Sequence, residues 1–75
     1  MEQTVRAEMV ASVHSIVTEV GAQVAVGDTL MILESMKMEI PVIVEVAGPV
    51  VDIPVRPGDV VHEGDLLVTL SLTAG

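Results

Sequence analysis

The stretch Gly27–Leu33 reads GDTLMIL, and the stretch Gly64–Leu70 reads GDLLVTL. The likeness extends outward from both stretches, so that Val10–Leu33 matches Ala47–Leu70 at a constant offset and without a gap. Two copies are too few for a solenoid, which needs several repeats to bury a continuous core. The repeat therefore predicts a duplicated half-domain that folds on itself with pseudo-two-fold symmetry.

Length and composition favour one small domain built from strands. Seventy-five residues suffice for a single domain, which we place at residues 1–75, with half-repeats at about 6–34 and 43–71. Apolar residues make up 51% of the chain, yet Phe, Tyr, Trp and Cys are absent. The core must therefore consist of Val, Ile, Leu and Met. Since β-branched side chains pack well on a pleated surface, this composition favours strands.

Turn residues divide each half into short strands. Glycines in both halves supply the positive φ that turns require, and Asp28 and Asp65 follow two of them as turn residues, not as a pair of catalytic acids. No segment has a helical period. The sequence predicts an all-β sandwich or flattened barrel of about eight strands. The expected strands are residues 5–11, 13–17, 23–25, 29–34, 38–44, 49–53, 60–61 and 66–71.

The segment Ser35–Pro41 joins the two copies and has no counterpart within either. The chain must reverse at Met36 and Lys37, where a two-residue hairpin normally prefers Asn-Gly or Asp-Gly. Exposed methionine is also unfavourable at such a tip. Lys37 is the only lysine in a chain with eleven acidic residues. An ordinary solvated lysine is the alternative, but these features predict a target for a modifying enzyme.

The segment Glu34–Glu39, which reads ESMKME, resembles the attachment motif of the biotinyl/lipoyl domain family, whose biotin branch usually reads Glu-Ala-Met-Lys-Met. The resemblance extends from about Val5 to Leu70. It implies a flattened barrel of two four-stranded antiparallel sheets, with biotin attached covalently to Lys37 on a hairpin at one end. It also implies that a ligase or partner reads the residues around Lys37, namely Glu34, Ser35, Met36, Met38 and Glu39. Ser35 replaces the usual alanine and is expected to tune recognition without abolishing it.

The resemblance implies a carrier, not an enzyme. A biotin protein ligase would load Lys37, and separate biotin carboxylase and carboxyltransferase components would use the swinging arm. The first half lacks the protruding insertion of some carboxylase domains, so the chain looks most like single-domain biotin carboxyl carrier-like proteins. A lipoyl carrier and an unmodified scaffolding barrel are the alternatives, and the methionines around Lys37 argue against the first. Storage of biotin also remains open, as does the carboxylase served.

Charge and hydropathy exclude other classes of partner. A net charge of −8 disfavours binding to nucleic acid. Charged residues interrupt each apolar run before the roughly 18 residues that a spanning helix needs. The N-terminal residues lack the pattern of a secretory signal, and we expect a cytoplasmic monomer with no fused enzyme.

The remaining candidate residues have structural explanations. His14 and His62 have no third ligand nearby in the sequence and are expected on the surface, not in a metal site. Met9 and Met31 are interpreted as core filler. The serines lie in no nucleophile motif, so no catalytic residue is predicted.

Overall fold

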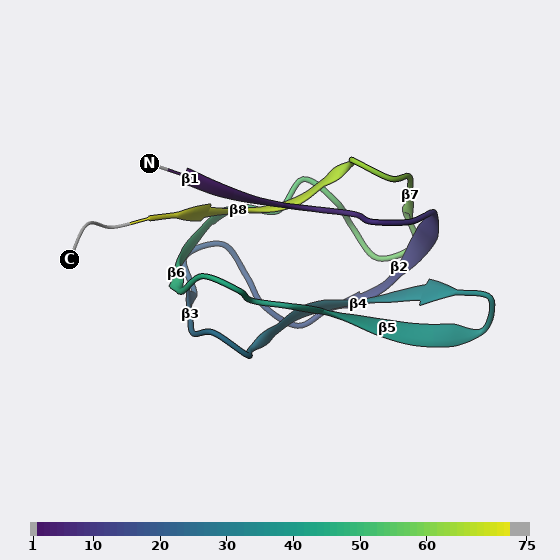
Figure 1. Cartoon of the computed structure of the whole chain (residues 1–75), viewed down its shortest axis with the longest axis horizontal. Coiled ribbons are helices and arrows are strands. Elements are labelled where there is room, and N and C mark those ends of the chain that lie inside the picture. Colours follow the sequence, from purple (N-terminus) through teal and green to yellow (C-terminus); the bar gives the residue numbers. More distant parts are fainter. Residues whose placement is uncertain (1, 73–75) are drawn as a thin grey trace.

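The computed structural model describes residues 2–72, in which eight strands and no helix occur (Figure 1). The all-β prediction is confirmed. No helix within these residues is long and apolar enough to cross a membrane. The strands are β1 (Glu2–Arg6), β2 (Ala11–Ile16), β3 (Gln23–Val24), β4 (Thr29–Ser35), β5 (Met38–Ile43), β6 (Gly48–Asp52), β7 (Val60–Val61) and β8 (Leu66–Ser71).

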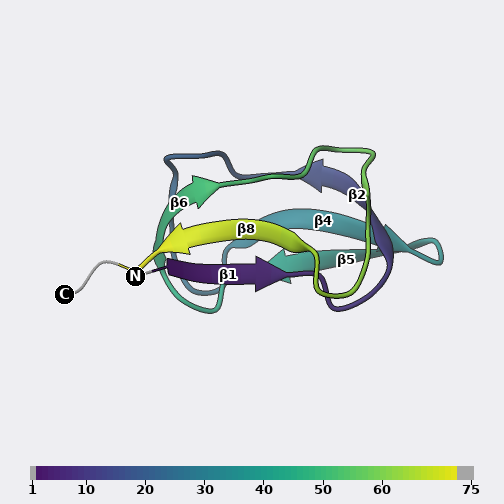
Figure 2. The same cartoon turned by 90° about the horizontal axis from the view of Figure 1, so that it is seen from above.

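The strands form two four-stranded antiparallel sheets that pack as a sandwich, as predicted, with β1 and β8 in one layer and β4 and β5 in the other (Figure 1). Figure 2 looks down on the two layers from above. One sheet has the order β1-β8-β6-β3 and the other the order β5-β4-β2-β7. Each sheet therefore takes two strands from each half of the chain. The molecule is elongated, with extents of 40 × 19 × 17 Å. The β4–β5 hairpin projects at one end, and β1 begins and β8 ends at the other (Figure 1).

The internal repeat appears in the topology and in the hydrogen bonds. Moving along the chain by the offset of the repeat (Gly27 to Gly64) turns one sheet order into the other. The backbone bond from Ala7 N to Asp65 O in one place has its equivalent in the bond from Val44 N to Asp28 O. These matched contacts support the pseudo-two-fold relation that the sequence predicted.

The turns of the two halves follow one design. In the turn that begins at Arg56, Pro57 is followed by Gly58 with a φ of 94°, and the amide of Asp59 donates to the carbonyl of Arg56 at 3.0 Å. This is a type II turn, which favours Pro and Gly in these two positions. The carboxylates of Asp28 and Asp65 accept backbone hydrogen bonds in equivalent turns. The prediction that they are turn residues is confirmed.

The core contains only aliphatic and Met side chains. Among the residues described, its largest fully buried members come mainly from the two central strands β4 and β8 and include the repeat-related pair Leu30 and Leu67. Met31 is also fully buried, as predicted. The hairpin therefore extends from a strand, β4, whose inner side chains belong to the core.

The first strand and Met9 were predicted incorrectly. Residues 5–11 do not form one strand, because β1 ends at Arg6 and the chain bends before β2 begins at Ala11. Ala7 is buried where the chain leaves the first sheet and crosses to the second. Met9 lies in this bend and is 40% exposed, so it is not core filler.

Candidate functional site

The β4–β5 hairpin closes through Met36 and Lys37 alone. Ser35 pairs with Met38 at the base of the turn, and the register continues without a shift as far as Met31 and Val42. Met36 has a φ of 52° and Lys37 a φ of 64°. Two positive values in a two-residue loop are those of a type I′ turn, whose twist matches the flanking strands. The predicted reversal is therefore present, with residues that such turns disfavour.

The tip is strained and is held in place by its surroundings. Among residues 2–72, Met36 and Lys37 are the only non-glycine residues with positive φ. Each such residue costs on the order of 1 kcal/mol. The ladder of β4 and β5 imposes this conformation, and β4 is itself flanked by β2. Strain that the fold maintains at an exposed tip indicates a functional constraint.

Replacing Met36 with asparagine should stabilise the protein by about 0.5–1 kcal/mol, because asparagine adopts positive φ more readily than methionine. Urea unfolding followed by far-UV circular dichroism would measure the change in the free energy of unfolding. Met38→Asn is the matched control, since Met38 lies in a strand and asparagine is unfavourable in strands. An unchanged or lower urea midpoint for Met36→Asn would contradict the strain at the tip.

Lys37 is exposed at the tip, and none of the ion pairs found among residues 2–72 involves it. Glu34 and Glu39 lie directly opposite each other behind it. Like charges in this arrangement are unfavourable. His14, on β2, approaches Glu39 at 3.5 Å between Nε2 and Oε2. The tip thus presents an accessible amine in front of two carboxylates. A partner with basic groups can neutralise the negative charge of these carboxylates.

The side chains beside Lys37 are apolar and exposed. Met36 is 88% exposed and Met38 is 59% exposed. Ser35 turns toward the bend between β1 and β2, where its hydroxyl donates to the carbonyl of Val10 at 3.3 Å. The five residues predicted to read the attachment site therefore surround Lys37, and the Ser35 contact adds the bend to this neighbourhood. The sequence did not indicate Met9 and Val10, because the bend was taken for a strand.

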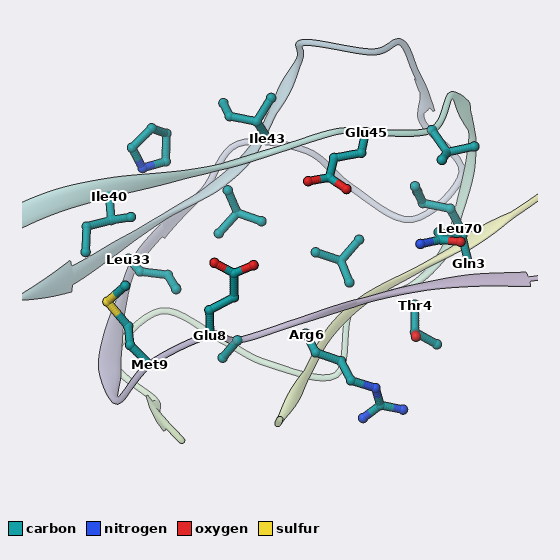
Figure 3. A pocket seen from close by; sticks show the side chains of 15 residues that line it. Gln3, Thr4, Arg6, Glu8, Met9, Leu33, Ile40, Ile43, Glu45 and Leu70 are labelled. Atoms are coloured by element: carbon teal, nitrogen blue, oxygen red, sulfur yellow. The ribbon is translucent and has the colours of Figure 1, made fainter. Parts of the chain in front are cut away.

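A groove of about 500 Å³ runs between the edge strands β1 and β5. Figure 3 shows the carboxylates of Glu8 and Glu45 pointing into it from opposite sides. Met9, Leu33 and Ile40 line its hairpin end. The walls of the groove are largely apolar, and Arg6 and Thr4 on β1 also line it.

The two histidines lie on the surface, as predicted. His14 contacts Glu39, and His62 contacts Asp65 at 3.8 Å within a turn. In the part of the chain that the structure covers, no three His, Asp or Glu residues lie close enough together to hold a metal ion. The hairpin tip combines an exposed amine, that of Lys37, with a strained backbone.

Comparison with known proteins relates both the chain and its fold to carriers. The profile of biotin/lipoyl attachment domains, described as "Biotin-requiring enzyme", matches residues 3–70. The biotinylated protein TB7.3 homolog of Mycobacterium leprae is 52% identical over 71 residues, which are 95% of this chain and 100% of that protein. The biotin/lipoyl attachment protein of Bacillus subtilis is 40% identical over 91% of this chain and 93% of its own length.

A similar fold occurs in a solved structure of a single-chain, multi-domain long-chain acyl-CoA carboxylase. The TM-score is 0.89 and the sequence identity is 33%, over 96% of this chain. The matched part is 7% of the carboxylase chain.

Proposed function

Because the chain belongs to the family of biotin/lipoyl attachment domains, we propose that it is a carrier domain that holds biotin in amide linkage on Lys37. The observation that carries the proposal is the position of the chain's only lysine, exposed at the tip of a strained two-residue hairpin. Relatives named as biotinylated proteins support biotin as the group attached. The domain is a substrate of other enzymes and is not itself catalytic.

The residues at the tip fit the attachment reaction. Nζ of Lys37 attacks the carboxyl carbon of biotin that a ligase has activated as its adenylate, so that a C–N bond forms and AMP leaves. Since a lysine amine in water is almost entirely protonated at neutral pH, the ligase must accept a proton before this attack. The loss of positive charge on Lys37 then leaves a neutral arm at the end of the fold.

The residues around Lys37 have the role of recognition. Met36 and Met38 provide exposed apolar contacts, and the facing pair Glu34 and Glu39 provides negative charge that a basic surface can bind. Ser35 fixes the base of the turn against Val10. We assign these residues to binding of the ligase and of later partners.

When bound, biotin supplies a ureido nitrogen that carries a carboxyl group between active sites. We propose a biotin carboxylase and a carboxyltransferase as the two partners, because the fold is shared with part of an acyl-CoA carboxylase. Attachment gives the arm an effective concentration on the order of mM at a bound partner. Since the ligase consumes ATP, we propose that the domain acts in the cytoplasm, and we expect it to be a monomer.

The name of the Bacillus subtilis relative makes lipoate the second candidate. Incubation of the purified domain with a biotin ligase, and separately with a lipoate ligase, would distinguish the two by intact mass and peptide mapping. We expect one biotinyl group on Lys37 and no lipoyl group. If only a lipoyl adduct forms, the cofactor is lipoate and not biotin. If the chain stays unmodified in the presence of active ligases, the domain is a scaffolding barrel.

A further inference from the structure

The bend between β1 and β2 forms a shoulder beside the hairpin. We define this shoulder by Met9 and Val10, which are 40% and 58% exposed. The carbonyl of Val10 accepts the hydrogen bond from Ser35, two residues before Lys37. The register of β2 on β4, in which Ser12 pairs with Glu34, brings the residues before β2 toward the tip. The shoulder is therefore part of the surface next to the attachment site.

Exposure alone does not distinguish the shoulder, because other valines along the chain are equally exposed. The shoulder is distinguished by its location next to the hairpin that carries Lys37. The exposed Met36 and Met38 lie on either side of Lys37, close in the chain to Ser35, which contacts the shoulder. Met9 also lies against the hairpin end of the groove (Figure 3). Glu8 adds its carboxylate beside the shoulder, in addition to the acidic pair on the hairpin. The surface next to Lys37 is thus apolar with an acidic border.

The short reach of the unmodified lysine decides which enzyme must contact this surface. Five bonds of roughly 1.5 Å in a zigzag put Nζ roughly 6 Å from the Cα of Lys37. A ligase that acylates this nitrogen must therefore approach the tip closely and meet its neighbours. Once biotin is attached, the arm is at least roughly twice as long. A carboxylase can then reach the cofactor without touching the shoulder.

We propose that Met9 and Val10 form part of the docking surface for the biotin ligase, together with Met36 and Met38. The occupant is an enzyme surface with an apolar recess and basic groups at its border, which match the acidic border of the tip. This inference rests on the proposed function, since it assumes that Lys37 is biotinylated. It assigns a recognition role to a segment that lies far from the attachment motif in the sequence.

The pseudo-two-fold symmetry supplies a matched control. Val46 is the repeat equivalent of Met9, lines the same groove at its other end and is 39% exposed. A polar substitution at Val46 should therefore perturb the fold as much as one at Met9. It lies at the end away from Lys37 and should not affect the ligase. The two positions separate an effect on docking from an effect on stability.

The test is the steady-state rate of biotinylation of the full chain by a purified biotin ligase. We expect the Met9→Gln, Val10→Thr double variant to lose about tenfold in kcat/KM, mainly through a higher KM, because two apolar contacts of the docking surface are lost. Val46→Thr should stay within about twofold of the original chain. Met9→Leu, which remains apolar, should retain the original rate. Thermal melts followed by circular dichroism would show that each variant is folded.

The possible results are distinguishable. If the original chain is biotinylated and the double variant reacts as fast as Val46→Thr, the docking inference is wrong while the proposed function stands. If Val10→Thr alone reacts normally although Met9→Gln is unfolded, the inference is also contradicted. If the original chain is not biotinylated by an active ligase, both the proposed function and the inference are overturned.

Discussion

Replacing Lys37 with arginine is expected to reduce biotin attachment to the background of the assay, without a change in fold. The guanidinium keeps the charge, but it is not a nucleophile that the ligase can acylate. No other lysine is present in the chain to take its place. Lys37 has a positive φ. Arginine at this position is no easier to hold in that conformation than lysine, so the strain at the tip is retained. Streptavidin blotting and intact mass would measure attachment, and far-UV circular dichroism would measure the fold.

A control variant tests whether a lysine at another position of the chain can be biotinylated. Arg56 is exposed in a turn of the second half, and Arg56→Lys combined with Lys37→Arg restores one lysine at a different site. This double variant should remain unmodified, because the new amine lies outside the hairpin and its apolar surroundings. Biotin on the relocated lysine, or residual biotin on Lys37→Arg, would show that the hairpin tip is not the determinant of attachment.

The position of Lys37 could be predicted because it depends on local features. The repeat divides the chain into two matched halves, and the segment that belongs to neither must connect them. A connector between two adjacent antiparallel strands has to reverse, and Met36 and Lys37 were the residues available. The same repeat made the strand order symmetrical. These consequences follow from chain connectivity and do not require knowledge of long-range packing.

The neighbours of the tip could not be predicted, because they depend on where the chain changes sheets. Val5, Ala7 and Met9 alternate with charged residues, as a strand would. Alternation does not reveal that Ala7 is buried at a crossing and that Met9 lies beyond it. The contact of His14 with Glu39 is similarly hidden, since it depends on a register shift within β2. Each missed contact joins residues that only the assembled strands bring together.

The repeat also hides one asymmetry that should have a large effect on stability. Ala11 begins β2, and its equivalent Gly48 begins β6. Both positions are buried. A Cβ atom on Gly48 would collide with the backbone carbonyl of Ser71 on β8. Because this obstacle is backbone within a sheet and not a flexible side chain, the collision cannot be relieved by a rotamer change.

We therefore expect Gly48→Ala to lower the free energy of unfolding by about 3 kcal/mol. For a domain of this size the total is only roughly 4–11 kcal/mol, so the melting temperature should fall by about 12–24 °C. The reciprocal change Ala11→Gly removes one methyl group and should cost only about 1 kcal/mol. Far-UV circular dichroism is suited to both measurements, because the chain has no aromatic residue to report unfolding by fluorescence. Equal losses of about 1 kcal/mol for the two variants would contradict this prediction, because they would mean that β6 and β8 can move apart to accommodate the added methyl group at little cost.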